Sequence, residues 1–517
     1  MINRFVILLL GLTCLAVTES AAKVTLPQIY TDSMVVQQWS TAGFHGKATP
    51  GATVTAVAGW GKESTAIADG DGNWELTIVT PKASLKTYTV SLTDGADNSV
   101  VTLSGVMAGE VWLCSGQSNM EMPLAGWGKV MNYEQEIATA AYPYIRLLHI
   151  KRHTSMLPCR DTPVEGGGWQ VCSPVTVPEF SAVAYFFARE LWRELKVPVG
   201  VIDCTWGGSP IEAWLSYKTL SDAFGFKGII DSRQDSIMDD PAIRARYASL
   251  LEGHNSGEKP VERVDSASYG HRDGFPGTID GHTFYPAELH NAMLFPLSHL
   301  SIKGVLWYQG ENNGDRAGQY DCLFPRLIND WRELFGNPSM PFYYVQLANW
   351  RARKDVQPHS DWGYLRESQA RALHMPYTGM AVTIDIGEAD DIHPKNKQEV
   401  ARRLSLIALA RDYGRKVGYR APAYRDYSIE GDTCYITFDA PSSAFMKSDV
   451  SLDGFIIAGT DGQFYKAEAR WAGDRLAVSS PYVRVPVAVR YAWADNPAVS
   501  LYGRNMLPVA PFRTDTW

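Results

Sequence analysis

The pattern of apolar and polar positions divides the chain into three regions. From residue 23 to about 105, short runs with alternating apolar and polar residues are separated by turns rich in Gly, Asp and Pro. This spacing predicts a small β-sandwich module. Between 106 and 417 the pattern changes to apolar strand-like runs that alternate with helical patterns. Short alternating runs return after 418, which predicts a second all-β module over 418–517.

The middle region has the pattern of an α/β domain. Five apolar runs predict strands, and Ser181 is a suitable N-cap for a helix over 182–195; two more helices are predicted over 320–335 and 396–413. Strands that alternate with helices favour a five-stranded parallel sheet covered on both faces, with its binding site beyond the carboxyl ends of the strands. The polar, weakly periodic stretch 217–285 interrupts this alternation and is interpreted as an insertion or lid. The five predicted strands are 110–114, 198–203, 302–308, 342–347 and 380–386.

Residues 1–22 have the features of an export signal. Arg4 supplies a positive start, 5–17 an apolar run, and 20–22 small residues for cleavage. We therefore expect export into a periplasm or secretion. A lipoprotein anchor at Cys14 is disfavoured, because the residues before it lack the usual small side chains.

Composition excludes several classes of protein. The chain has 517 residues, 45% hydrophobic and 20% charged, with a net charge of −8, which disfavours nucleic acid as a partner. No later segment approaches the roughly 18 uninterrupted apolar residues of a membrane span, so no integral membrane segment is predicted.

Cys159 and Cys172 flank a Gly/Pro-rich loop and could form a disulfide. The absence of a Cys-x-x-Cys motif argues against a zinc or redox site.

Two segments carry residues suited to nucleophilic catalysis. Ser118 follows an apolar run and a Ser-Gly-Gln turn, and a serine becomes a nucleophile when an adjacent base takes its proton. His393 is the best base among eleven histidines, and Asp390, three residues earlier, could orient it. Spacing alone leaves Asp391 open as the partner. The alternatives are a serine that caps a helix and an acidic loop that leads into a helix.

Other turns could supply hydrogen bonds to an oxyanion. The N–H of Ser118 and that of Gly207 or Gly208 are suited to this role, because glycine permits close approach of the backbone. A side-chain amide could come from Asn312 or Asn313. The plain alternative for the two glycines is a strand-to-helix turn. All these segments follow predicted strands, so the topology gathers them at one edge of the sheet.

These segments resemble the SGNH, or GDSL-like, hydrolase superfamily, and more closely its sialate O-acetylesterase family. The resemblance implies a flavodoxin-like three-layer catalytic domain that uses no metal or other cofactor. It assigns Ser118 as nucleophile, His393 as general base and Asp390 as its orienting carboxylate, with Asn312 in the oxyanion hole; in some relatives the amide comes one residue later, at Asn313. The matching segments are LCSGQSNM (113–120), WGGSPIEAW (206–214), GVLWYQGENN (304–313), DDIHP (390–394), VRYAW (489–493) and PFRTD (511–515).

The predicted function is hydrolysis of O-acetyl esters of sialic acid through an acetyl-enzyme. Acetylated polysaccharide such as xylan is the alternative substrate, and a non-catalytic glycan-binding protein is the alternative of another class. The carboxylate of sialic acid would favour a nearby arginine. The sequence does not determine the number of subunits. The residues assigned to substrate binding are Gln117, Gln309, Glu311, Arg316 and Arg351, with Arg353 as a further arginine.

Overall fold

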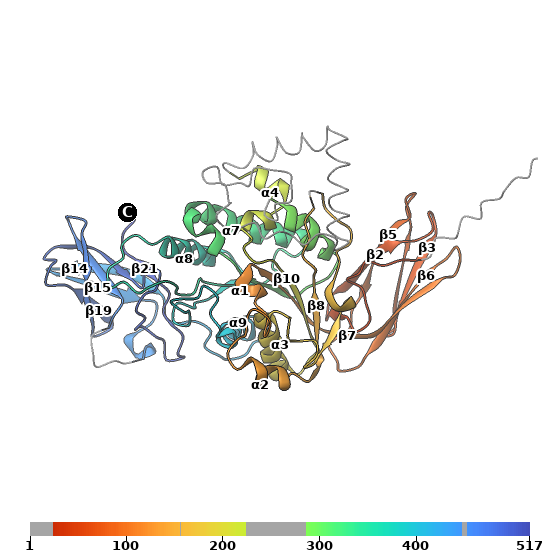
Figure 1. Ribbon diagram of the computed structural model, residues 1–517, viewed down its shortest axis with the longest axis horizontal. Coiled ribbons are helices and arrows are strands. Elements are labelled where there is room, and N and C mark those ends of the chain that lie inside the picture. Colours follow the sequence, from red (N-terminus) through yellow and green to blue (C-terminus); the bar gives the residue numbers. More distant parts are fainter. Residues whose placement is uncertain (1–23, 156, 224–285, 447–451) are drawn as a thin grey trace, which may run out of the picture.

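The computed structural model describes residues 24–155, 157–223, 286–446 and 452–517. A central α/β region lies between two β modules, one at each end of the molecule (Figure 1). The predicted export signal and most of the predicted insertion 217–285 lie outside the described residues; the short helix α4 (Tyr217–Ser221) marks the start of that stretch. No helix in these ranges is both long enough and apolar enough to cross a membrane.

The N-terminal module is joined to the central region by one continuous strand. The first half of β7 pairs antiparallel with β6, and its second half lies in the central sheet. The predicted boundary at 105 therefore falls inside a strand of 17 residues. The strands of this module are β1 (Val35–Gln37), β2 (Thr41–Lys47), β3 (Thr53–Ala58), β4 (Lys62–Ile67), β5 (Asn73–Val79), β6 (Tyr88–Asp94) and β7 (Val100–Gly116).

The central sheet has the order β13-β12-β11-β7-β10-β8-β9, with every pair parallel except β8 with β9. The five predicted strands are present, but the predicted number was too low, because β8 adds a sixth parallel strand. Pro143 and Arg146 interrupt the apolar run of β8, so the hydrophobic pattern did not predict this strand. The strands are β8 (Tyr142–His149), β9 (Gln170–Cys172), β10 (Val199–Thr205), β11 (Gly304–Tyr308), β12 (Phe342–Val345) and β13 (Thr378–Ala381).

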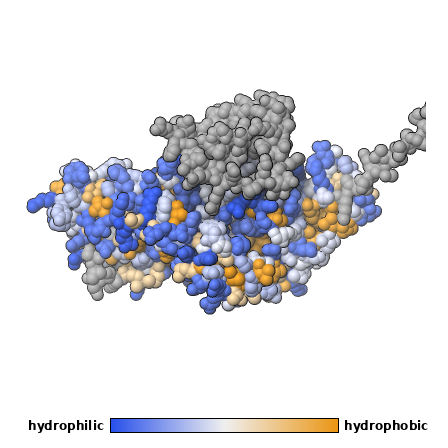
Figure 2. Space-filling model, viewed as in Figure 1, coloured by the Kyte–Doolittle hydropathy of each residue, from blue (hydrophilic) through white to orange (hydrophobic). Residues whose placement is uncertain are grey.

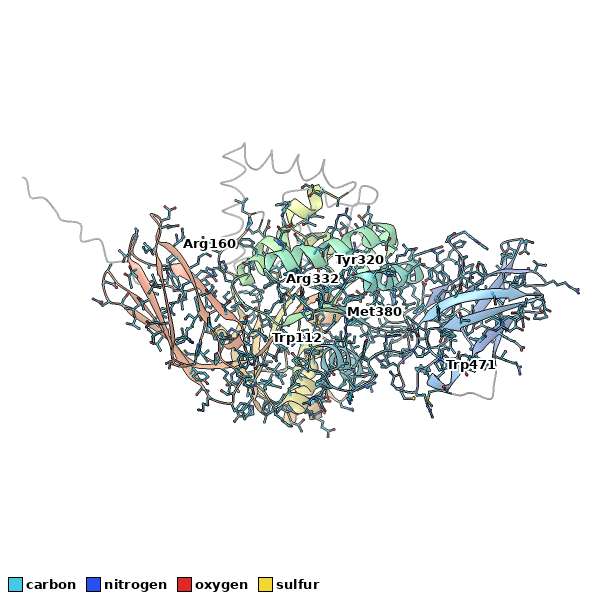
Figure 3. The ribbon with its side chains drawn as sticks, turned by 180° about the vertical axis from the view of Figure 1, so that it is seen from behind. Trp112, Arg160, Tyr320, Arg332, Met380 and Trp471 are labelled. Atoms are coloured by element: carbon cyan, nitrogen blue, oxygen red, sulfur yellow. The ribbon has the colours of Figure 1, made fainter. Side chains whose placement is uncertain are left out.

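Helices cover both faces of this sheet. In Figure 1, α3 and α9 lie on one face and α7 and α8 on the other. The Ser181 side chain accepts a hydrogen bond from the N–H of Ala184 and so caps α3, as predicted. Trp112 of β7 is fully buried in the middle of this region (Figure 3). The helices are α1 (Ser118–Glu121), α2 (Tyr133–Ala138), α3 (Ala182–Leu195), α7 (Ala317–Leu334), α8 (Asp361–Arg371) and α9 (Lys397–Arg411).

The C-terminal module consists of two four-stranded sheets, β14-β15-β19-β18 and β17-β16-β20-β21, with a hydrophobic core of their own. Along β15, buried and half-buried residues alternate, as expected for a strand with one inward face. The outer surface over this module is mostly hydrophilic in Figure 2. Its strands are β14 (Tyr424–Glu430), β15 (Thr433–Phe438), β16 (Phe455–Gly459), β17 (Phe464–Lys466), β18 (Glu468–Ala472), β19 (Arg475–Ser479), β20 (Pro486–Tyr491) and β21 (Phe512–Arg513).

The disulfide considered between Cys159 and Cys172 is not formed. Both residues are free thiols. Cys172 is buried at the end of β9, where its thiol donates to the carbonyl of Ala140, and Cys159 lies in the loop after β8. The two sulfurs thus have separate surroundings, and the loop between them folds without a covalent link.

Candidate active site

The residues singled out from the sequence meet at the carboxyl ends of neighbouring parallel strands. Ser118 follows β7, Gly207 follows β10, and Gly310 follows β11. The turn before Ser118 needs glycine: Gly116 has a φ of +138°, and a Cβ there would lie 2.2 Å from the carbonyl oxygen of Tyr308. This close approach of β7 and β11 lets Ser118 begin a short helix, α1, at the edge of the sheet.

Ser118 and His393 are in direct contact. The Nε2 of His393 lies 2.8 Å from the Oγ of Ser118, a hydrogen-bond distance. The side chain of His393 is 30% exposed. An imidazole in this position is placed to take the proton of the serine hydroxyl.

The carboxylate beside His393 is that of Asp391, and the prediction of Asp390 is corrected. Asp391 Oδ1 lies 3.5 Å from His393 Nδ1 and accepts the backbone N–H of His393 at 2.8 Å. This turn, in which a carboxylate binds the backbone two residues on, directs Asp391 toward the imidazole. Asp390 is exposed, and within the described ranges Asp391 supplies the carboxylate within ion-pair distance of His393.

Burial and a neighbouring cation favour the neutral form of His393. Removal from solvent has the largest effect and lowers the pKa of His393 below its usual value; the positive charge of Lys397 lowers it further, and Asp391 opposes both. A neutral imidazole can accept a proton, whereas an imidazolium cannot. The surroundings therefore favour the form of His393 that acts as a base near neutral pH.

Gly207 lies beside Ser118, but its N–H already has an acceptor. A Cβ on Gly207 would lie 3.3 Å from the Cβ of Ser118. The N–H donates to the carboxylate of Glu121, whose pKa is raised by burial. A substrate oxygen that uses this N–H must displace Glu121. Gly208, by contrast, presents its carbonyl, which accepts from the side-chain amide of Asn312.

Asn312 and Asn313 have different surroundings. Asn313 is fully buried: its Oδ1 accepts from Gln309 at 2.7 Å and its Nδ2 donates to Glu212 at 2.9 Å. Asn312 is only half-buried and lies across from Gly208. Of the two amides, that of Asn312 is therefore the one placed at the edge of the site.

Gln117 and Gln309 hydrogen-bond to neighbouring groups within the protein, and their assignment to substrate binding stays a prediction. The Oε1 of buried Gln117 accepts the N–H groups of Gly310 and Asn312, at 3.3 and 3.2 Å. Buried Gln309 donates to the carbonyl of Ser209 at 3.2 Å. Turns at strand ends leave backbone groups without sheet partners, and these amides satisfy them.

The charged residues assigned to substrate are also engaged within the protein. The Oε1 of Glu311 accepts from Asn119 at 2.5 Å, and its carboxylate is buried. Arg316 pairs with buried Glu212. Arg351 pairs with Asp495 at 3.2 Å, although its side chain remains half exposed. Glu311 and Arg316 thus help to hold the third turn in place, and their assignment to substrate binding stays a prediction.

Two residues missed in the sequence line the site. Trp127 is 51% exposed, and its ring meets that of His393 edge-on, with centroids 5.2 Å apart. Arg152, also half exposed, places its Nη1 3.4 Å from the Oε1 of Glu121. Both residues lie in loops without hydrophobic periodicity, so the sequence carries no signal of where their side chains point.

A serine–histidine pair at the carboxyl edge of a parallel sheet, with amide groups beside it, defines a class of serine esterase. The chain matches the family described as "Carbohydrate esterase, sialic acid-specific acetylesterase" over residues 108–245 and 277–408, more than half of its length. It belongs to this family. It is accordingly a carboxylic ester hydrolase with acetylesterase activity.

Named relatives agree with this assignment. The chain is 29% identical to mouse sialate O-acetylesterase over 93% of both chains. It is 31% identical to the human sialate O-acetylesterase over 75% of this chain and 71% of the relative. Among solved structures, a carbohydrate acetylesterase from Xanthomonas citri is 35% identical, with a TM-score of 0.79, over 96% of this chain and 100% of that one.

Proposed function

We propose that the enzyme works through an acetyl-enzyme on Ser118. The Ser118 Oγ attacks the acetyl carbonyl carbon while His393 Nε2 takes the hydroxyl proton. The C–O bond to the sugar then breaks, and the same proton passes to the departing sugar oxygen. Water, deprotonated by His393, then attacks the acetyl carbon. The bond from this carbon to Ser118 Oγ breaks, the Oγ regains the proton from His393, and acetate leaves. The observation that carries this proposal is the 2.8 Å contact between Ser118 and His393.

The developing oxyanion would be bound by the N–H groups of Ser118 and Gly207 and by the side-chain amide of Asn312. Gly207 lies against Ser118, and Asn312 is the half-buried amide of the third turn. Asp391 would stabilise the imidazolium that forms during attack, because its carboxylate is the one beside Nδ1. Preorganised donors of this kind often supply the largest single part of the rate enhancement.

We infer that the substrate is O-acetylated sialic acid. The family description and the mammalian relatives support this substrate, while the description of the Xanthomonas citri enzyme as a carbohydrate acetylesterase supports a broader class. Arg152, on the far side of Glu121 from Gly207, is suited to bind the sialic acid carboxylate. Trp127, half exposed beside His393, offers an apolar surface to the sugar or its acetyl group.

Acetate release from 9-O-acetylated sialic acid, measured beside acetylated xylan, tests the substrate. We expect the sialic acid ester to be the better substrate by kcat/KM, with all release lost in Ser118→Ala. Preference for xylan would overturn the substrate and keep the mechanism. Release that persists in Ser118→Ala would overturn Ser118 as the nucleophile. Release from neither ester by the wild type would favour a glycan-binding role for the chain.

Charge-removing variants test the role of Arg152. We expect Arg152→Met to raise KM for acetylated sialic acid about tenfold or more, the loss of one charge-assisted pair, and to leave KM for a neutral acetate ester unchanged. Lys151→Met, which removes an exposed charge from the adjacent position, is the matched control. If Arg351→Met raises KM selectively and Arg152→Met does not, Arg351 rather than Arg152 binds the carboxylate.

Two further assignments complete the proposal. We infer a flavodoxin-like SGNH hydrolase fold, because the five strands predicted from the sequence run in the order 2-1-3-4-5 when taken alone.

We also propose export directed by residues 1–22, on the basis of their sequence alone. Cell fractionation tests this: the full chain should reach the periplasm or medium, and a chain lacking 1–22 should remain in the cytoplasm.

A further inference from the structure

A buried lysine lies next to the catalytic loop. Lys397 is the first residue of α9, four positions after His393, and its side chain is fully buried. Its Nζ donates to the Oδ1 of Asn119 at 2.5 Å and lies 5.2 Å from the centre of the Tyr308 ring. Within the described ranges this ammonium forms no ion pair within 4.0 Å. Burial of an ammonium group without a close carboxylate is unfavourable, so its presence needs an explanation beyond packing.

Asn119 connects this lysine to three catalytic segments. Its Nδ2 donates to the Oε1 of Glu311 at 2.5 Å and to the carbonyl of Ile392 at 3.0 Å. Asn119 directly follows Ser118, and Ile392 directly precedes His393. One side-chain amide thus bridges the nucleophile turn, the histidine loop and the turn that carries Asn312.

The two charged neighbours of Asn119 fix the orientation of its amide. An ammonium can only donate, so it faces Oδ1, and the carboxylate of Glu311 can only accept, so it faces Nδ2. A flip of the amide would oppose donor to donor and acceptor to acceptor. The chain Lys397–Asn119–Glu311 therefore has one favourable arrangement, and it holds all three turns at once.

The charge of Lys397 also acts on His393. Among the described residues, the ionisable groups that act on His393 are Asp391 of its own loop and Lys397 from α9. The imidazole also contacts the Ser118 hydroxyl and meets the Trp127 ring edge-on. Burial lowers the pKa of Lys397 to about 7, against the opposing effect of its acidic neighbours Glu311, Asp391 and Glu388. Lys397 is therefore protonated at the acidic pH values where His393 gains its proton. Its positive charge is thus present in the pH range in which it can oppose protonation of His393.

We propose that Lys397 is a positioning residue that holds Ser118, His393 and Asn312 in register through Asn119. The inference rests on the proposed role of His393 as general base. It assigns to Lys397 two separable effects, one on the geometry of the turns and one on the pH range of the reaction.

The pH dependence of kcat/KM separates these effects, because its acid limb reports ionisation of the free enzyme. Lys397→Met removes the cation, so protonation of His393 becomes easier and the acid limb should move to higher pH. The plateau value of kcat/KM in Lys397→Met should also fall, by up to about 100-fold if the turns shift by about an ångström. Lys397→Arg keeps the charge and should keep the acid limb, whatever happens to its plateau. Lys395→Met removes an exposed charge two residues away and should match the wild type.

Two results would overturn this inference. One is a folded Lys397→Met enzyme whose acid limb coincides with that of the wild type. The other is an equal shift in Lys395→Met. If Lys397→Met does not fold, Lys397→Arg decides, because an upward shift of its acid limb contradicts the charge argument. His393→Ala is assayed in parallel: if it keeps wild-type activity, the proposed general base is wrong, and that failure is distinct from a failure of Lys397.

Discussion

Replacement of Asp391 by Asn tests the arrangement of the catalytic residues where sequence and structure differ. The amide has nearly the same size as the carboxylate, and its oxygen can still accept the backbone N–H of His393, which Asp391 accepts at 2.8 Å. The loop should therefore keep its shape. What is lost is the negative charge beside Nδ1. In the proposed mechanism, this charge stabilises the imidazolium that forms during attack.

The size of the effect follows from the exposure of this carboxylate. Loss of the charge from an enclosed catalytic triad lowers the rate about 10,000-fold. Asp391 is 42% exposed and lies 3.5 Å from Nδ1, so water screens part of its interaction with the ring. We expect Asp391→Asn to lower kcat about 100-fold, which corresponds to about 2.7 kcal/mol of barrier.

Asp390→Asn is the matched control, because it removes the same charge one residue earlier. Asp390 is exposed and should lose less than about threefold in kcat. Both variants are assayed with p-nitrophenyl acetate at the pH plateau, with circular dichroism as the check of folding. A larger loss in Asp390→Asn than in Asp391→Asn would refute the assignment of Asp391.

Three further predictions concern the site and the C-terminal module. Burial and Lys397 lower the pKa of His393, so its neutral form persists to lower pH. The acid limb of kcat/KM measured against pH should therefore lie below the usual histidine pKa of about 6.5. An acid limb above that value would contradict the reasoning. Asn312→Ala should lower kcat about 100- to 1,000-fold without loss of stability, whereas buried Asn313→Ala should mainly lower the melting temperature; the reverse pattern would exchange their roles. Asp515→Ala should cost about 3–5 kcal/mol of stability, seen as a lower urea midpoint, because it leaves fully buried Arg490 without its bidentate partner; an unchanged midpoint would show that the module tolerates the unpaired charge.

The fold could be predicted where hydrophobic pattern and local signals agree. The α3 helix begins and ends at the predicted residues, because Ser181 is a strong N-cap and the following apolar positions recur at helical spacing. The β8 strand was missed because Pro143 and Arg146 break its apolar run, yet pairing with β10 still places it in the sheet. Pairing partners are distant in the sequence, so a strand that they stabilise can lack a pattern of its own.

The sequence predicts which turns carry the site residues, but it does not predict the directions of their side chains. Ser118 and His393 follow from the order of the motifs at strand ends, which the parallel topology brings to one edge. The direction of a side chain within a turn does not follow from spacing, and for that reason Asp391 could not be separated from Asp390. The pattern also gives no indication that Lys397 is buried, because its surroundings come from Asn119 and Glu311, far away in the chain.

The most direct test of the central claim is detection of the acetyl group on Ser118. The enzyme is mixed with acetylated sialic acid, quenched in acid within one turnover, digested, and examined by mass spectrometry. We predict that the peptide that contains Ser118 gains the mass of one acetyl group, and that this species disappears as free acetate forms. Acetate release by the wild type without any acetylated Ser118, or with the acetyl group on another residue, would contradict the mechanism.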